Sequence, residues 1–268
     1  ICQSNPLTSL NLTGLVYLEY LICVATQLTG IDLSTQSSLI VMDCSFSRLI
    51  NLDVSHSPNL ITLECSSCDL TSLNVIGLAQ LETLNCLDNA LPALDLSGLT
   101  HLKTLNCSGN QLQTLDLSGL PELVTLACNQ NILTSINLSG VSNLITLNCH
   151  HNNLSDINVD DAVNLESLHC QYNQLVTLDV NRLTHLIELY VYQNLPLTSL
   201  FMKNGVDEDT FFSDNPNLRY VCADESQMAE LQQMITDAQL VNVTVSNSYC
   251  SFNPGGNYNT ISGNIKYD

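Results

Sequence analysis

The spacing of the cysteine residues constrains this chain more than any other feature of its sequence. Cys86, Cys107 and Cys128 lie 21 residues apart, and the same step continues in both directions. Nine of the 12 cysteines fall on it: Cys2, Cys23, Cys44, Cys65, Cys86, Cys107, Cys128, Cys149 and Cys170. Cysteines that serve metal binding or catalysis do not recur at one fixed interval. The spacing therefore indicates a structural repeat, stacked many times over.

Each repeat carries leucine at fixed distances from its cysteine, in the pattern L-x-x-L-x-C-x-x-N-x-L-x-x-L-D-L-S-G-L-x-x. The residues around the cysteine alternate between inward and outward positions, which is typical of a β-strand with one buried face. A single strand of this kind cannot bury its apolar side. Parallel copies stacked about 4.8 Å apart cover one another, and about ten of them predict a body on the order of 50 Å long.

The cysteine belongs to the buried row of this strand, as a small apolar side chain. Side chains in one row of a parallel sheet point the same way, which disfavours the geometry of a disulfide. We therefore expect a column of free, buried thiols at Cys23, Cys44, Cys65, Cys86, Cys107, Cys128, Cys149 and Cys170. The segment Cys65-Ser-Ser-Cys68 resembles a redox or metal motif. The repeat accounts for it, because Cys65 is in the buried row and Cys68 replaces a turn residue.

A polar column lies three residues after each cysteine. Here the chain turns inward, which takes backbone N–H and C=O groups away from water. Asparagine satisfies such groups best, because its short side chain carries both a donor and an acceptor. We expect a structural polar column at Asn89, Asn110, Asn131, Asn152, Asn173 and Asn194, with Thr26, Ser47 and Cys68 in the same place in earlier coils.

Together, these columns resemble the leucine-rich repeat signature. The 21-residue length, the cysteine on the strand and the L-D-L second half are similar to the bacterial class called IRREKO. The resemblance covers residues 1–200 and implies a curved solenoid with a parallel sheet on its concave side. The second half of each unit repeats the spacing of the first, which predicts a short extended segment on the convex side. The expected fold is a mainly β, leucine-rich repeat solenoid of about ten coils.

The regular step stops after Asn194, where one extra residue enters. We expect an irregular last repeat and a C-terminal cap over residues 201–250. Residues 226–238 place apolar side chains on one helical face, which predicts one amphipathic helix, followed by a strand within 240–250. Residues 251–268 resemble a linker toward a following domain, and the segments around them resemble those that close such arrays in secreted surface proteins of Bacteroidota.

Cys222 and Cys250 lie off the 21-residue step, on either side of the predicted helix. In an exported protein, a disulfide between them would tether the cap. On the chain-entropy model such a loop closure contributes about 3–4 kcal/mol. We predict this disulfide.

Carboxylates offer two candidate calcium sites. One is a column in the second half of the repeats: Asn11, Asp32, Asp53, Asn74, Asp95, Asp116, Asn137, Asn158 and Asp179. Neighbouring carboxylates there could share a calcium ion, but such side chains more often accept hydrogen bonds from turn N–H groups, which Asn does equally well. The other is the loop with Asp207, Asp209 and Asp214, which lacks the spacing of a calcium loop. We favour the structural reading and expect no metal or cofactor.

The outward positions of the expected sheet lie three before, one before and one after each cysteine. They are small and polar in the middle of the chain, but aromatic, acidic or imidazole groups gather toward its C-terminal end. The candidate ligand-binding residues are His150, His169, Gln171, Tyr172, Glu188, Tyr190 and Tyr192. Tyrosines on a rigid sheet give a large contact area at low entropy cost. Two other readings stay open: aromatic pairs that only stabilise the sheet, and a zinc site on His150 and His169.

The formal net charge is −20, with six Lys and Arg against 26 Asp and Glu. Such a surface repels nucleic acid and anionic membranes, and no apolar run is long enough to span a bilayer. Nucleophile, zinc-protease and phosphate-loop motifs are absent. We therefore expect a monomeric, non-catalytic recognition module of a secreted or cell-surface protein, with a protein or glycan partner. The alternative is a structural spacer that binds nothing through the sheet.

Overall fold

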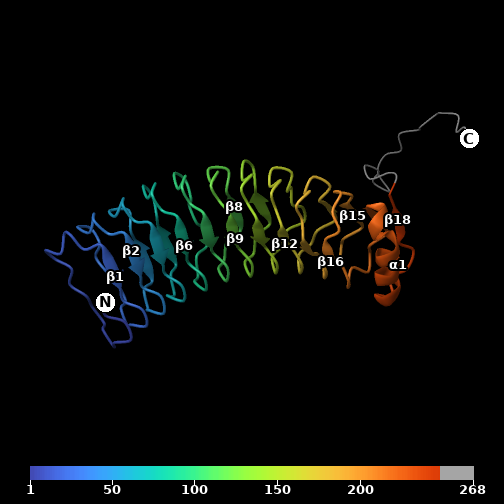
Figure 1. Ribbon diagram of the computed structural model, residues 1–268. Helices are drawn as coiled ribbons and strands as arrows, with labels where there is room; N and C mark the ends of the chain where they lie inside the picture. The colour runs from blue at the N-terminus through green and yellow to red at the C-terminus, as the bar shows by residue number, and fades with distance from the viewer. Residues whose placement is uncertain (248–268) are drawn as a thin grey trace, which may run out of the picture.

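The computed structural model describes residues 1–247. The chain winds into coils that stack side by side in one gently curved body (Figure 1). Ten parallel strands, one per coil, form what we call the main sheet. They are β1 (Tyr20–Ile22), β2 (Val41–Asp43), β4 (Thr62–Glu64), β6 (Thr83–Asn85), β7 (Thr104–Asn106), β9 (Thr125–Ala127), β11 (Thr146–Asn148), β12 (Ser167–His169), β14 (Glu188–Tyr190) and β16 (Asp209–Phe211). The predicted mainly β solenoid is confirmed.

The second half of the coils carries smaller parallel sheets. These are the pair β3 (Asn51–Asp53) and β5 (Ser72–Asn74), the pair β8 (Thr114–Asp116) and β10 (Ser135–Asn137), and a four-stranded sheet of β13 (Thr177–Asp179), β15 (Ser199–Met202), β17 (Tyr220–Ala223) and β18 (Thr244–Ser246). The repeated leucine spacing of the second half therefore does produce the extended segments that it predicts.

One continuous core fills the space inside the coils. The register keeps equivalent residues opposite one another, so that Leu84 pairs with Leu63 on one side and Leu105 on the other. Burial of one such leucine contributes about 1.5–3 kcal/mol. The cysteines from Cys23 to Cys170 on the 21-residue step are free and have no exposed surface. Burial raises the pKa of the Cys86 thiol to about 12, so this thiol stays protonated and apolar in character.

The asparagine column forms a ladder of hydrogen bonds between coils. Asn110 donates from Nδ2 to the carbonyl of Cys107 in its own coil at 3.1 Å and to that of Cys86 in the preceding coil at 3.0 Å. Its Oδ1 accepts the backbone N–H of Leu91 at 3.0 Å. The same three contacts recur at Asn89, Asn131, Asn152, Asn173 and Asn194. Each amide thus satisfies backbone groups of two successive coils.

Smaller side chains hold this place in the early coils and make fewer contacts. Thr26 Oγ1 donates to the carbonyl of Cys23 at 3.0 Å. Cys68 Sγ donates to the carbonyl of Cys44 at 3.1 Å and accepts the hydroxyl of Ser47 at 3.3 Å. A hydrogen bond with Cys44 lowers the pKa of the Cys68 thiol to about 7, but the side chain has no exposed surface. Cys68 therefore serves as a buried turn residue.

The expectation that the 21-residue step ends after Asn194 is wrong for the main sheet. Phe212 lies 21 residues after Val191 and fills the buried position of the cysteine column at 1% exposure. Asn215 extends the polar column by donating to the carbonyls of Phe212 at 2.8 Å and Val191 at 3.2 Å. The extra residue before Leu197 is offset by one residue fewer before Phe212. As a result, β16 pairs in register with β14.

A short cap closes this end of the core. The 3-10 turn η1 (Glu225–Gln227) leads into α1 (Met228–Asp237), which buries Leu231 and Ile235 as the sequence predicts. The strand β18, within the expected range, pairs with β17.

Within residues 1–247, no helix is long and apolar enough to cross a lipid bilayer. Cys222 is buried on β17, whereas Cys250 and the expected linker 251–268 lie outside the described residues, so the disulfide stays a prediction.

A buried carboxyl group lies between the cap and the last coil. Glu208 is 7% exposed and accepts hydrogen bonds from Gln227 Nε2 at 3.0 Å and Asn204 Nδ2 at 3.4 Å. Burial raises the pKa of this carboxyl from an ordinary 4.5 to about 7. Between these two pH values the folded cap holds a proton that the unfolded chain releases, so raising the pH weakens the cap.

The stability that Glu208 contributes should be fully present below about pH 4.5 and lost as the pH rises through about 7. Hydrogen exchange of the α1 amides between pH 5.5 and 8, corrected for intrinsic exchange rates, measures this opening. We expect the corrected opening to increase with pH in the native chain, and Glu208→Gln to abolish most of the increase. An identical pH dependence in both proteins would contradict this assignment.

Candidate ligand-binding surface

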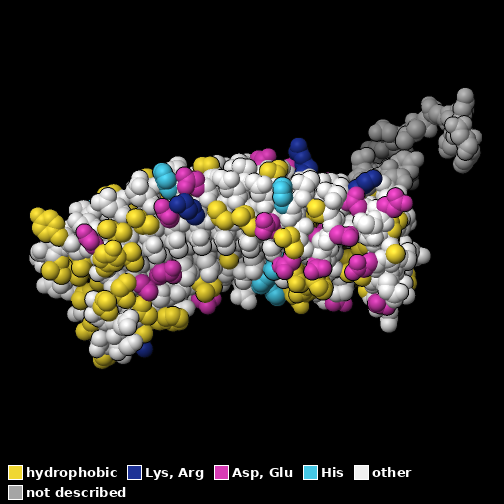
Figure 2. All heavy atoms as spheres, viewed as in Figure 1, with side chains coloured by type: hydrophobic (Ala, Val, Ile, Leu, Met, Phe, Trp, Pro, Cys, Tyr) yellow, Lys and Arg dark blue, Asp and Glu magenta, His cyan; other side chains and the backbone are white. Residues whose placement is uncertain are grey.

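Outward side chains of the main sheet line up in columns that cross its strands. At the C-terminal end, over β11, β12, β14 and β16, these columns change from small polar residues to aromatic, imidazole and acidic ones. We call this group the aromatic patch; it consists of His150, His151, His169, Gln171, Tyr172, Glu188, Tyr190, Tyr192 and Phe211. Figure 2 shows histidine, hydrophobic and acidic side chains gathered along the lower edge of the face in view, toward its C-terminal end.

The rings of the patch touch one another in an unbroken series. Tyr190 lies at its centre, with its ring stacked on Phe211 at a centroid distance of 4.7 Å and set edge-on to His169 at 4.4 Å. The series continues through Tyr190–Tyr192 at 6.5 Å, Tyr192–Tyr172 at 5.4 Å, Tyr172–His151 at 4.1 Å and His151–His150 at 4.8 Å. These separations match those of favourable aromatic pairs. The rings therefore form one preorganised surface.

The structure brings all seven sequence-predicted residues together in this patch. His150 and His151 follow β11; Gln171 and Tyr172 follow β12, which itself contains His169; the remaining three lie on or directly after β14. The sequence prediction does not include Phe211, because it ends the 21-residue step after Asn194. The signal was present, since Phe211 lies 21 residues after Tyr190 and 42 after His169.

Two polar groups in the patch have distinct surroundings. Glu188 Oε2 lies 3.5 Å from His169 Nε2 and accepts the hydroxyl of Ser167 at 3.2 Å, while its side chain stays 46% exposed. Gln171 is only 8% exposed, and its Oε1 is the one buried side-chain nitrogen or oxygen within residues 1–247 that has no hydrogen-bond partner. An unpaired buried acceptor of this kind costs about 1–3 kcal/mol.

Two aromatic residues of the patch occupy a strained backbone position. In each coil, the residue two after the buried cysteine position adopts a left-handed conformation, as Gly109 does with a φ of 64°. Glycine suits this position, and other residues pay about 1–2 kcal/mol there. The chain nevertheless places His151 (φ 52°) and Tyr172 (φ 56°) in this column. Non-glycine residues such as Ala25, Phe46 and Gln130 adopt the same conformation in other coils, so the strain belongs to the repeat, and at His151 and Tyr172 the position also carries a ring of the patch.

The candidate metal ligands do not converge. Within residues 1–247, no group of three or more His, Cys, Asp or Glu side chains is placed to hold a metal ion. His150 Nδ1 lies 2.7 Å from Nδ1 of His151, and burial lowers the pKa of His150. In the acidic loop, Asp207 accepts the hydroxyl of Ser226 at 3.4 Å, while Asp209 begins β16 and Asp214 lies in the left-handed column.

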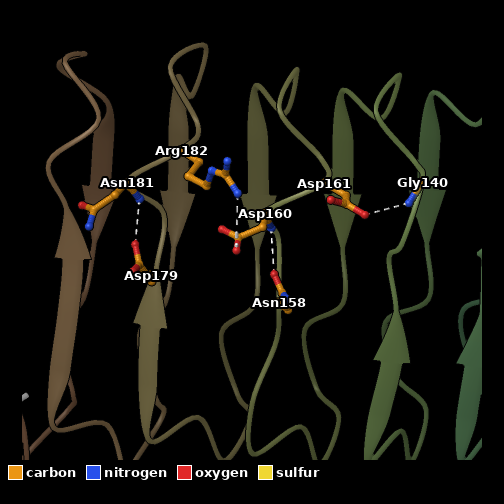
Figure 3. Close-up of polar contacts among 7 residues, drawn as sticks. All are labelled: Gly140, Asn158, Asp160, Asp161, Asp179, Asn181 and Arg182. Atoms are coloured by element: carbon orange, nitrogen blue, oxygen red, sulfur yellow. Dashed lines mark hydrogen bonds and ion pairs between the residues drawn. The ribbon is translucent and has the colours of Figure 1, made fainter. Parts of the chain in front are cut away.

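The Asp/Asn column of the second half accepts hydrogen bonds in turns. Asp179 Oδ1 accepts the N–H of Asn181 and Asn158 Oδ1 that of Asp160, each at 2.9 Å, as Figure 3 shows. The same contact with the N–H two residues on lowers the pKa of Asp95. Asp and Asn make the same bond, which is why the two alternate freely along the column.

An open groove of about 500 Å³ runs along the edge where the main-sheet strands begin. Its lining is Lys103, Glu122, Val124, Asn143, Ile145, Asn164, Glu166 and His185. Lys103 pairs with Glu82 at 3.0 Å and is 46% exposed. The lining side chains include no hydroxyl or thiol group.

Solved structures with this fold include bacterial and animal proteins. The functional domain of InlJ from Listeria monocytogenes, which includes a cysteine ladder, is 28% identical, covers 78% of this chain and 54% of that chain, and has a TM-score of 0.54. The leucine-rich effector protein YopM from Yersinia pestis is 23% identical over 78% and 61% of the two chains, with a TM-score of 0.58. The glycosylated Toll–Spatzle complex from Drosophila matches at 17% identity, 83% and 39% coverage, and a TM-score of 0.64.

This chain has the leucine-rich repeat fold. A scan against protein-family models and a search of curated proteins both found no match. The chain spans about half the length of the InlJ chain that it matches. The cysteine ladder named for InlJ has a counterpart here in the column of buried thiols from Cys23 to Cys170.

Glycine should be tolerated better than alanine at Tyr172. Tyr172→Ala removes the ring but keeps a side chain in the left-handed position, whereas Tyr172→Gly removes both. We expect the glycine variant to be more stable than the alanine variant by about 1 kcal/mol, measured by the midpoint of urea unfolding. Gln130, in the same column with a φ of 55°, provides a matched Ala and Gly pair without ring contacts. If the alanine and glycine variants were equally stable at both positions, the claim that this left-handed position is strained for residues with a side chain would be contradicted.

Proposed function

We propose that this chain is the non-catalytic recognition module of a secreted or cell-surface protein, and that it binds a protein or glycan partner through the aromatic patch. The observation that carries the proposal is the joining of seven rings into one outward surface at one end of the main sheet. In the middle coils the first outward column is small and polar, with threonine at 62, 83, 104, 125 and 146.

Energetics support a binding role for these rings. Tyrosine is enriched among the residues that dominate binding energy, because a rigid ring buries a large area and loses little conformational freedom. Tyr172 is 41% and Phe211 46% exposed, so both offer surface to a partner.

The setting of the module is inferred from its repeat, its cysteines and its charge. The 21-residue repeat with cysteine on the strand favours a bacterial protein of the IRREKO-like class, as in surface proteins of Bacteroidota. A Cys222–Cys250 disulfide would fit an exported protein. The charge of −20 disfavours nucleic acid as a partner and keeps the chain monomeric. Toll was solved in complex with Spatzle, so in that protein the fold holds a protein partner.

The second candidate is a structural spacer with no ligand on the sheet. Ring pairs across neighbouring strands stabilise a sheet without any partner. The contacts of Tyr190 with His169 and Phe211, its neighbours on both sides, are of this kind.

The test is a glycan array together with a pull-down from the surroundings of the source organism. The native chain is compared with Tyr190→Ala/Tyr192→Ala. The matched control is Asn106→Ala/Ser108→Ala, which changes the same two columns in an earlier coil. We expect a ligand that the native chain and the control retain and the tyrosine variant loses.

Retention of that ligand by the tyrosine variant would place binding outside the patch and contradict the proposal. Capture of no ligand by any of the three proteins would favour the spacer. Circular dichroism and the urea midpoint of each variant show whether a loss of binding reflects a loss of folding.

A further inference from the structure

The aromatic patch is also the part of the main sheet where carboxylates and an unpaired acceptor accompany the rings. We propose that its ligand is a cationic, arginine-bearing segment of a partner protein. The inference rests on the proposed function, since it names the chemistry that the same surface would recognise. Three independent features of the patch favour a ligand that is a positively charged hydrogen-bond donor.

The first feature is the charge beside the rings. Glu188 and Asp209 lie opposite each other in the register of β14 and β16, two residues before Tyr190 and Phe211. Both carboxylates are accessible. Within residues 1–247, the basic residues are Arg48, Lys103, Arg182, Lys203 and Arg219, and none of them lies in the outward columns of the main sheet. The two carboxylates therefore have no Lys or Arg of their own chain on this surface.

The second feature is the π surface itself. Tyr190 and Phe211 are stacked face to face with an interplanar angle of 6°, and His169 lies edge-on to Tyr190. Phe211 is on the last strand of the main sheet, so the ring face that it turns away from Tyr190 is the one open to a cation, beside Asp209. The face of an aromatic ring carries partial negative charge and attracts a cation, and the planar guanidinium of arginine stacks on it particularly well. A cation here would contact a ring and a carboxylate together.

The third feature is the unpaired oxygen of Gln171. Its side chain lies between His150 and Tyr192 in one column, with Oε1 buried and without a donor. Native proteins seldom leave such an acceptor unsatisfied. Arginine offers five N–H donors and no acceptor. Gln171 and the two carboxylates lie in columns four strand positions apart, so separate arginines of one segment would complement the amide oxygen and the carboxylates. A neutral sugar could supply a donor to Gln171 but would bring no positive charge to Glu188 and Asp209.

Long-range charge acts in the same direction. With a net charge of −20, the whole molecule draws cationic partners toward its surface and repels anionic ones. Non-specific attraction of this kind would not select the patch. The experiment must therefore separate binding at Glu188 and Asp209 from attraction to acidic groups in general.

The probe is a short acetylated and amidated peptide of alternating arginine and glycine, titrated into the full chain at physiological salt. The same peptide with citrulline in place of arginine keeps the shape and removes the charge. Glu188→Gln/Asp209→Asn, called the patch variant, removes the charge of Glu188 in the patch and that of Asp209 opposite it. Asp95→Asn/Asp116→Asn removes two charges from the Asp/Asn column in the second half of the repeats, where asparagine occurs at equivalent positions. This variant is the matched control.

We expect the arginine peptide to bind the native chain and the control with affinities within about twofold of each other. The patch variant should bind at least about tenfold more weakly, which corresponds to about 1.4 kcal/mol. The citrulline peptide should bind more weakly than the arginine peptide by a similar factor. Chemical-shift changes should map to the patch.

Equal weakening in the patch and control variants would show general electrostatic attraction and overturn the inference. Equal binding of the arginine and citrulline peptides, or no binding of either, would overturn it as well. The proposed function is judged separately, because a ligand captured by the native chain and lost in Tyr190→Ala/Tyr192→Ala would establish the patch even if the arginine peptide fails.

Discussion

The amide of asparagine is the contact on which the rest of this structure depends. In each coil from Asn89 to Asn194, one side chain joins the carbonyls of two successive coils and receives a backbone N–H. One such hydrogen bond contributes only about 1 kcal/mol net, but a buried backbone group left unpaired costs about 1–3 kcal/mol. Three groups depend on each amide. The leucines supply the driving force for stacking, and the amides set where each coil lies relative to the next.

A surface with fixed columns follows from that ladder. Because the register is the same from β1 to β16, a residue's place in the repeat decides whether it faces the core, the turn or the main-sheet surface. Function then requires only a choice of side chains in the outward columns. The series of contacting rings, with Glu188 and Asp209 beside a stacked pair, distinguishes the C-terminal coils from the others.

Periodicity made the core, the strands and the asparagine ladder predictable, since each follows from position within the repeat. Periodicity did not predict the places of Phe212 and Asn215 in the buried and polar columns. One extra residue and one missing residue cancel within that coil, which conceals the 21-residue spacing. Seven residues of the patch were found from their columns. The ring geometry, the unpaired oxygen of Gln171 and the burial of Glu208 could not be found in this way. They depend on side-chain conformations and on how the cap docks, which no spacing encodes.

Hydrogen exchange of individual backbone amides, at pH 7, tests the ladder most directly. The N–H of Leu112 donates to Asn131 Oδ1 at 3.0 Å and that of Leu133 to Asn152 Oδ1 at 2.9 Å. Both should exchange as slowly as the N–H of Cys107, which donates to the carbonyl of Ala127 at 2.8 Å. The exposed turn amide of Ser118, bonded to Asp116, should exchange fast. If the Leu112 and Leu133 amides exchanged as fast as that of Ser118, the ladder would not hold the coils together.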